Sequence, residues 1–201
     1  GRTEIMRAIF GVDPHESGEL VFKGEPLKIT KPEDAIKAGM AFVTENRKTE
    51  GLILDFSILR NIALPSVDTF AKNSVINFGK LSGFADEMAK KLGVKAHSLE
   101  LEAGALSGGN QQKVVIAKWV GMNPDVIIMD EPTRGIDVGA KRDIYELMNE
   151  LTASGVSIIM VSSELPEVLG MSDRILVVHE GRIAGELLRD EADQEKIMTL
   201  A

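Results

Sequence analysis

The sequence contains no cysteine, and it has a single tryptophan and a single tyrosine among its 201 residues. The lack of cysteine excludes a disulfide framework and a thiolate–zinc site, and it agrees with a reducing compartment. Basic residues are outnumbered: 23 Lys and Arg stand against 31 Asp and Glu, for a net charge of −8. Nucleic-acid binders normally carry a basic surplus or stripe, so this balance argues against that class of protein.

Long apolar runs are also missing. The longest, Val126–Met129 and Val156–Val161, fall far short of the roughly 20 residues that a membrane span needs. No signal-peptide pattern opens the chain, whose first residue is Gly1 rather than Met. The apolar fraction of 44% and the charged fraction of 27% are ordinary for a globular protein. The length predicts one domain with, at most, a small additional lobe.

Strand and helix patterns alternate along much of the chain, which favours a layered α/β sheet. Short β-branched runs predict strands at Leu20–Lys23, Met40–Thr44, Asp125–Asp130, Val156–Ser162 and Arg174–His179, with a hairpin return at Arg182–Leu187. Helical spacing predicts helices at Thr3–Phe10, Pro32–Ala38, Asp137–Ala153, Glu164–Met171 and Asp193–Leu200. Asp137 is the expected N-cap of its helix.

The middle of the chain, from Ser57 to Gly121, shows helical signals and little strand. We expect helices at Ile58–Leu64, capped by Ser57, at Ser82–Leu92 and at Gly108–Met122. The coarse organisation is therefore a set of strand and helix units, a helical insertion, and further strand–helix–strand units.

The strongest chemical signal is the pair Asp130–Glu131 at the end of the apolar run Val126–Met129. Such a strand places two carboxylates at the C-terminal edge of the sheet, where α/β folds bind their ligands. One carboxylate can hold Mg²⁺ and the other can orient a water molecule. The alternative is a buried strand followed by an ordinary acidic turn, because strand ends with acids are common.

Two further segments predict phosphate contacts. Ser107, Gly108 and Gly109 open an apolar helix with a hydroxyl and bare N–H groups, a place that attracts phosphate; the alternative is a Ser N-cap after a flexible loop. Gly1, Arg2 and Thr3 match the last three places of the phosphate-loop pattern, with Arg2 where Lys is usual; the alternative is simply a chain start.

Taken together in this order and spacing, these segments resemble the ATP-binding cassette (ABC) ATPase family. Residues 106–111 look like its signature loop, residues 126–131 its Walker B strand, and residues 133–137 its D-loop, with Asp137 in the acidic place. The resemblance implies a P-loop NTPase-like α/β core at residues 1–56 and 124–201, with the helical subdomain at 57–123. It also implies ATP as ligand, with Mg²⁺.

A narrower resemblance runs through residues 106–119, 130–141 and 161–186, which are similar to the second cassette of the tandem ATPases that energise bacterial monosaccharide importers. That likeness implies three partners: a companion cassette in the N-terminal half of the same polypeptide, membrane permease subunits, and indirectly a periplasmic sugar-binding protein. It implies no nucleic-acid partner, and a place at the cytoplasmic face of the membrane. Residues 51–64 resemble the segment that contacts the membrane subunit.

The chain departs from the ABC pattern at four positions. Arg2 replaces the phosphate-loop Lys, and its wide planar head does not reproduce an ammonium between phosphates. Ser163 falls where a switch His is usual, and it carries no charge near neutral pH. Glu45 stands near the position of the family's Q-loop Gln, so a carboxylate that can ligate Mg²⁺ replaces an amide that can donate a hydrogen bond. Asn110 replaces the Gln of the signature loop and keeps an amide.

Three of these departures concern the site built on this cassette's own Walker motifs. In ABC proteins each ATP is held by one cassette's Walker motifs and by the other cassette's signature loop. We therefore expect Ser107, Gly108 and Gly109 to act on the companion's nucleotide, and this cassette's own site to bind or hydrolyse ATP weakly. The alternative is that the substitutions are compensated and both sites turn over. In the resemblance, Thr3 and Asp130 hold Mg²⁺ and Glu131 orients or deprotonates water.

Two other functions stay open on the sequence: a catalytically silent cassette with a structural or regulatory role, and a non-transport ABC ATPase. The resemblance also predicts that the chain lacks the strands and most of the phosphate loop before Gly1, so that the isolated chain binds ATP poorly and does not hydrolyse it. Arg47 and Lys48 are expected to lie in a solvated loop rather than at a phosphate site.

Overall fold

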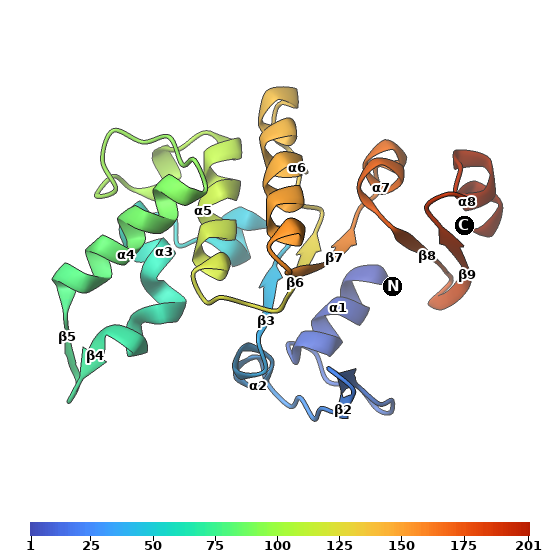
Figure 1. Cartoon of the computed structure of the whole chain (residues 1–201), viewed down its shortest axis with the longest axis horizontal. Helices are drawn as coiled ribbons and strands as arrows, with labels where there is room; N and C mark the ends of the chain where they lie inside the picture. The colour runs from blue at the N-terminus through green and yellow to red at the C-terminus, as the bar shows by residue number, and fades with distance from the viewer. The chain divides into compact units, whose positions relative to one another are not determined.

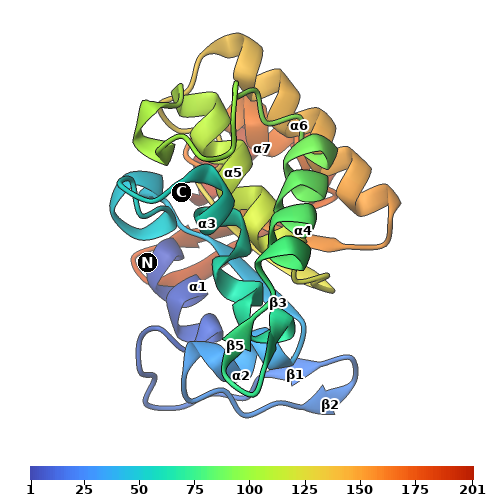
Figure 2. The same ribbon diagram turned by 90° about the vertical axis from the view of Figure 1, so that its left-hand side faces the viewer.

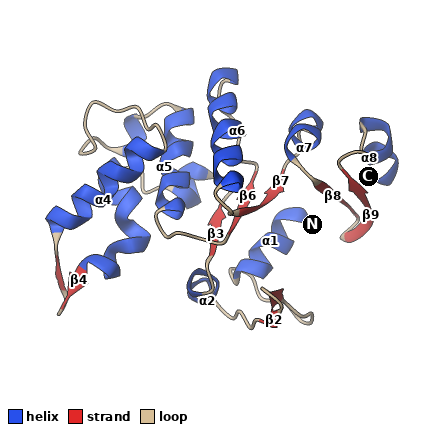
Figure 3. Ribbon diagram, in the orientation of Figure 1, coloured by secondary structure: helices blue, strands red, loops and turns tan.

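The structure is a computed structural model that describes residues 1–201. The chain divides into two compact units, one made of Gly1–Ala38 with Met160–Ala201 and the other of Gly39–Ile159. Figure 3 shows strands alternating with helices, as the sequence predicts, and a helical stretch in the middle of the chain.

The elements follow the predicted order closely, as Figure 1 shows. The helices are α1 (Arg2–Phe10), α2 (Pro32–Lys37), α3 (Ile58–Ala63), α4 (Phe78–Lys91), α5 (Gly108–Val120), α6 (Val138–Ala153), α7 (Leu165–Met171) and α8 (Gln194–Leu200), with shorter turns η1 (Arg47–Gly51), η2 (Leu64–Phe70) and η3 (Ala103–Ala105). The strands are β1 (Val21–Phe22), β2 (Glu25–Pro26), β3 (Met40–Val43), β4 (Ala71–Lys72), β5 (Val75–Ile76), β6 (Val126–Asp130), β7 (Ser157–Val161), β8 (Arg174–His179) and β9 (Arg182–Leu188).

The second unit is built on the strands β3 and β6, which run parallel from the pair Met40 and Val126 to the pair Val43 and Met129. The sheet order is β3–β6–β7. All four residues of β3 are buried, as are Ile127–Asp130 of β6, which explains why these strands are apolar on both faces. Since parallel strands end at a common edge, the residues that follow β3 and those that end β6 lie at one edge of this sheet.

Helices α3, α4 and α5 pack on one another in the same unit, as both Figure 1 and Figure 2 show. Their shared core includes Ile58, Ile62, Ala85 and Val114, each with no exposed surface. Helix α4 begins at Phe78, four residues before the predicted start at Ser82, because the Asn77 side chain accepts a hydrogen bond from the Lys80 N–H and caps the helix there. The hairpin of β4 and β5 was not predicted, because two-residue strands carry no periodic signal.

The first unit contains the hairpin of β8 and β9, which confirms the predicted return at Arg182. Helices α7 and α8 cover the hairpin through a small apolar cluster around Ile175, Val177 and Ile197. The same unit holds α1, α2 and the short hairpin of β1 and β2.

The predicted division into an α/β core at 1–56 and 124–201 and a helical subdomain at 57–123 stays a prediction. None of the helices combines the length and the apolar character that crossing a bilayer requires.

Candidate functional site

The edge where β3 and β6 end carries three of the predicted site residues, Glu45, Asp130 and Glu131. Asp130 is the last residue of β6 and has no exposed surface, whereas Glu131 is half-buried. Val43, the last residue of β3, pairs with Met129, so Glu45 follows its strand at the same edge as the two carboxylates. The predicted placement of the Asp130–Glu131 pair at a C-terminal strand edge is confirmed.

The backbone turns sharply after β6. Glu131 adopts a left-handed conformation with φ 48°, which is uncommon for a residue other than glycine. The Arg134 N–H closes the turn by donating to the Glu131 carbonyl oxygen at 3.1 Å. Non-glycine residues in this conformation persist where the surroundings impose it, and they gather at functional sites. At Glu131 the backbone therefore leaves the direction of β6.

Glu45 forms an ion pair with Arg134, so the segment after β3 meets the segment 131–137. The Glu45 side chain is 36% exposed and that of Arg134 is 63% exposed, which keeps the energy of this pair small in water. The structure therefore gives the Glu45 carboxylate a cationic partner within the chain. Its predicted contact with Mg²⁺ stays a prediction.

The start of α5 has the form that the sequence predicts. Ser107 is the N-cap, and its Oγ accepts a hydrogen bond from the Asn110 N–H. The N–H groups of Gly108 and Gly109 lie in the first helical turn, where no preceding helical carbonyl can accept them. Ser107 is exposed, so its hydroxyl and these two N–H groups form a small set of donors with a positive helix end behind them.

Both polar atoms of the Asn110 side-chain amide form hydrogen bonds within the chain. Its Nδ2 donates to Ser107 Oγ at 3.1 Å, and its Oδ1 accepts from the Lys95 N–H at 2.8 Å. The side chain therefore orients the Ser107 hydroxyl and ties it to the loop after α4. Its predicted contact with a nucleotide stays a prediction.

Asp137 caps α6, because its Oδ1 accepts from the Ala140 N–H at 2.9 Å. This confirms the predicted cap, and the Asp137 residue is exposed. The two helix starts are packed together: a Cβ placed on Gly109 would lie only 2.4 Å from the Ala140 Cβ. Glycine is required at 109 by this close approach, besides any contact with a ligand.

The remaining predicted residues lie in the first unit. Gly1 precedes α1, and Arg2 and Thr3 form its first turn. Arg2 Nη1 donates to the Ser162 carbonyl oxygen at 2.8 Å, so the structure brings Arg2 next to the exposed Ser163. The two predicted departures from the ABC pattern in this unit, Arg2 and Ser163, are therefore neighbours in space. The other predicted site residues belong to the second unit.

The donor set is consistent with Mg²⁺ held together with a nucleotide. No group of three or more His, Cys, Asp or Glu side chains gathers as a metal site in the chain. Mg²⁺ characteristically takes one or two carboxylates and completes its shell with water and substrate phosphates. A buried carboxylate at a strand end, Asp130, with a second acid beside it, supplies such a partial set.

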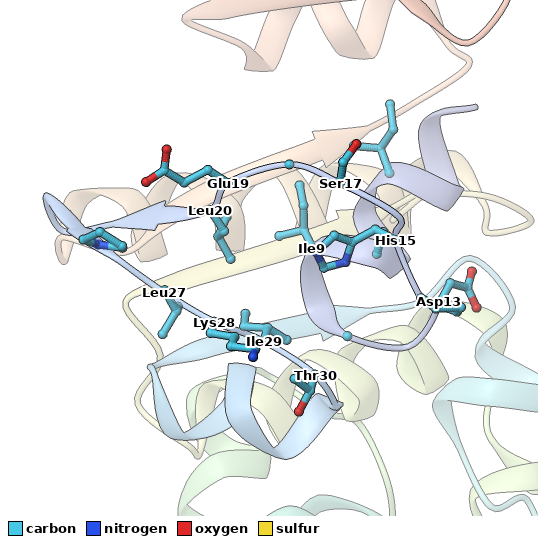
Figure 4. Close-up of a pocket in the computed structure, with 16 residues that line it drawn as sticks. Ile9, Asp13, His15, Ser17, Glu19, Leu20, Leu27, Lys28, Ile29 and Thr30 are labelled. Carbon is cyan, nitrogen blue, oxygen red and sulfur yellow. The ribbon is translucent and has the colours of Figure 1, made fainter.

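A cavity of about 840 Å³ lies in the first unit, bounded by α1, the loop that follows it and residues 26–30 (Figure 4). It is lined by apolar side chains, among them Ile9, Leu20 and Ile29, with Asp13 and His15 at its wall. Arg7 holds Asp13 through a hydrogen bond of 2.7 Å, which lowers the pKa of that carboxyl. None of the predicted site residues lines this cavity.

Sequence reasoning missed Arg47. It was expected in a solvated loop, but it is half-buried in the single turn η1 and donates to two backbone carbonyls of the segment 131–137. No signal in the sequence points to this role, because the acceptors are backbone groups far along the chain.

Comparison with known proteins identifies the family to which the chain belongs. The profile of the ABC transporter family matches residues 1–134. The ribose import ATP-binding protein RbsA of Oceanobacillus iheyensis is 63% identical over all 201 residues, and that of Bacillus subtilis is 61% identical. The chain spans 40% and 41% of these two proteins, about two fifths of their length.

Solved structures show the same fold. A dimeric ATP-binding cassette in a post-hydrolysis state with ADP and Pi aligns over 94% of this chain and 81% of its own, with a TM-score of 0.79 and 22% identity. A cassette of another ABC transporter aligns over 100% and 83%, with a TM-score of 0.83 and 22% identity. The fold is therefore the P-loop NTPase-like fold of these cassettes.

Proposed function

The chain belongs to the ABC transporter family, and from this premise we propose that it is the second ATP-binding cassette of a sugar importer. In this role it couples ATP binding and hydrolysis to sugar uptake through membrane subunits, from the cytoplasmic face of the membrane. The relatives named as ribose import ATP-binding proteins support this assignment, and ribose is the sugar that their name suggests. A periplasmic sugar-binding protein would deliver the sugar to the membrane subunits.

The observation that carries the proposal is the start of α5. Ser107 Oγ is exposed and oriented by Asn110, and the N–H groups of Gly108 and Gly109 stand in the first turn of a thirteen-residue helix. Hydrogen-bond donors fixed in this way stabilise the negative charge of a phosphate without having to reorganise. In the proposed sandwich of two cassettes, these donors act on the γ-phosphate of the ATP that the companion cassette holds.

Hydrolysis at this cassette's own site would use the carboxylates at the strand edge together with Thr3 of α1. Glu131 would orient or deprotonate the attacking water, and Thr3 and Asp130 would hold Mg²⁺. Mg²⁺ bound with the nucleotide neutralises charge on its phosphates. Asp137 would lie at the seam between the cassettes, and Gly1, Arg2, Glu45 and Ser163 would line the nucleotide.

We place the weaker of the two sites on this cassette. Arg2 cannot reproduce a point charge between phosphates, and its guanidinium donates to the Ser162 carbonyl in this structure. Ser163 supplies no cation near neutral pH, and Glu45 is paired with Arg134. Three departures at one site support slow turnover there, whereas the signature loop keeps its serine and both glycines.

Sugar uptake tests the proposed function. Deleting the gene for the full-length protein should abolish uptake of radiolabelled ribose or a related monosaccharide, and a plasmid copy should restore it. The purified full-length protein, assembled with its membrane subunits, should hydrolyse ATP. Unchanged uptake of every monosaccharide, together with a salt-dependent affinity for DNA or RNA, would instead identify a non-transport ABC ATPase.

A further inference from the structure

The half-buried guanidinium of Arg47 bridges two segments of the second unit. Its Nη1 donates to the Arg134 carbonyl oxygen at 2.7 Å, and its Nη2 donates to the Gly135 carbonyl oxygen at 3.0 Å. A planar guanidinium that donates to two successive carbonyls fixes the orientation of the turn as well as its distance from Arg47. A lysine ammonium donates from one point and does not fix the orientation. The turn that it holds lies between Glu131 and Asp137.

The same guanidinium lies against the signature loop. A Cβ placed on Gly108 would lie 2.8 Å from Arg47 Nη2 and 3.2 Å from the Gly135 carbonyl oxygen. An added methyl group would have to move the Arg47 guanidinium and would crowd the Gly135 carbonyl oxygen, so Arg47, the turn at 134–135 and the first residue of α5 are close neighbours. A side chain at position 108 would therefore disturb the place of the Arg47 guanidinium beside this turn.

The backbone that carries Arg47 is itself anchored on α5. At the start of η1, Asn46 Oδ1 accepts hydrogen bonds from the N–H groups of Lys48 and Thr49. At its end, Lys118 Nζ donates to the Gly51 carbonyl oxygen at 2.5 Å. Lys118 belongs to α5, the helix that begins with the signature loop, so this hydrogen bond ties the end of η1 to that helix.

The contact is not optimal for stability alone. Arg47 Nε is buried without a hydrogen-bond partner, and a buried donor without an acceptor costs free energy. Burial also lowers the pKa of Arg47, although a guanidinium stays protonated in proteins. A group held at this cost, between two loops that the proposed function uses, is better explained by positioning than by packing.

We propose that Arg47 is a positioning residue for ATP hydrolysis, which holds the turn at Arg134–Gly135 against Gly108 so that the segment 45–51 and both loops move as one piece. The ion pair of Glu45 with Arg134 gives the same segments a second connection. This inference rests on the proposed function, because it assigns these loops to the two nucleotides of a cassette pair. Through this contact, a displacement of the segment after β3 would change the donors that face the companion's phosphate.

Steady-state ATP hydrolysis by the full-length protein with its membrane subunits tests the proposal. Arg47→Ala should lower kcat about tenfold, the effect of losing hydrogen bonds from a charged group, while the KM for ATP changes by less than about twofold. Lys48→Ala is the matched control, because it removes an adjacent, exposed positive charge and should leave kcat within about twofold. All variants are assayed at a temperature where circular dichroism shows them fully folded.

The conservative variant Arg47→Lys tests whether the two donors of the guanidinium are needed or the positive charge alone. Arg47→Lys keeps the charge and offers donors at one point, so its kcat should fall between those of Arg47→Ala and the unaltered protein. Full activity in Arg47→Lys would overturn the bidentate account. Equal kcat values for Arg47→Ala and Lys48→Ala would overturn the proposal as a whole.

Hydrogen exchange gives a readout that needs no turnover. In the full-length protein, Arg47→Ala should speed exchange of the amides at 108–110 and 134–137 relative to Lys48→Ala, while the amides of α4 exchange at an unchanged rate. Unchanged exchange at both loops would overturn the inference even if ATP hydrolysis fell. An absence of ATP hydrolysis in the unaltered protein would instead count against the proposed function, and the exchange result would still decide the role of Arg47 as a link between the loops.

Discussion

The signature loop in the second unit and the segment around Arg2 in the first unit are held in different ways. Ser107–Asn110 is fixed by its own cap, by the Lys95 N–H and by close packing against Arg47 and Ala140. Arg2 and Ser163 are exposed, and the Arg2 guanidinium donates to a backbone carbonyl beside Ser163. The loop proposed to act on the companion's nucleotide is thus held by several contacts within the chain. Arg2 and Ser163, which are proposed for this cassette's own nucleotide, depart from the ABC pattern.

This difference agrees with the proposal that the cassette keeps its half of the companion's site while its own site has relaxed. In a head-to-tail pair, the signature loop serves the companion's ATP, so its geometry stays constrained even where the cassette's own site turns over slowly.

The largest effect is expected at Ser107. Ser107→Ala in the full-length protein should lower ATP hydrolysis by about 10²-fold, the loss typical when one fixed donor to a developing negative charge is removed. Arg2→Ala should change the same rate by less than about threefold if, as proposed, this cassette's own site contributes little turnover. Ser107→Thr keeps a capping hydroxyl and serves as the control for helix stability. A larger loss for Arg2→Ala than for Ser107→Ala would reverse the comparison.

The next effect concerns Lys118, which anchors η1 to the signature helix. Burial lowers its pKa from 10.5 to about 8, so between these values the unfolded chain binds more protons than the folded chain. The free energy of unfolding should therefore rise with pH across this window, by about 3 kcal/mol in total. Lys118→Met should remove this rise, since it carries no proton to release.

Urea denaturation at about pH 7, 9 and 10 measures this slope. Lys90→Met is a suitable control, because the Lys90 side chain is 75% exposed on α4 and its loss should leave the slope unchanged. An equal slope in Lys118→Met and the unaltered chain would show that Lys118 is not the buried base.

The smallest effect is expected at the link between α5 and α6. Lys113 Nζ donates to Asp143 Oδ2 at 2.7 Å, and this hydrogen bond lowers the pKa of Asp143. The Asp143 side chain is 44% exposed, so solvent screening should keep its contribution below about 1 kcal/mol. A lowered carboxyl pKa stabilises the fold above the ordinary value of 3.8, and this stability is lost as the pH falls through the folded pKa.

Asp143→Asn should therefore lower the unfolding midpoint slightly near neutral pH and have no further effect at low pH, in the same denaturation experiment. A loss as large as that for a buried ion pair, about 3 kcal/mol or more, would show that the α5–α6 contact is much less solvated than the exposure of Asp143 indicates.

Much of the fold was predictable because its signals are local. The apolar run before Asp130 predicts β6, and the Ser and Asp caps predict the starts of α5 and α6, where the side chains of Ser107 and Asp137 do accept the expected backbone hydrogen bonds. The predicted ends of these elements are correct to within two residues, since caps and strand ends depend on neighbouring residues alone.

The role of Arg47 was not predictable for the opposite reason. Its acceptors are the carbonyls of Arg134 and Gly135, 87 and 88 residues further along the chain, and a carbonyl acceptor leaves no trace in residue type. The pairing of Glu45 with Arg134 also depends on the parallel register of β3 and β6, which brings the two segments to one edge. Candidate site residues can be proposed from residue type and spacing, whereas the contacts that position them require the structure.

We propose that this cassette's own site turns over slowly while its signature loop serves the companion. The most direct measurement compares two variants of the full-length protein, Glu131→Gln and the corresponding substitution of the companion's catalytic base. Glu131→Gln should keep most of the ATP hydrolysis, whereas the companion variant should lose it by about 10²-fold or more. Loss of turnover in Glu131→Gln, with an active companion variant, would show instead that this cassette's own site carries the hydrolysis.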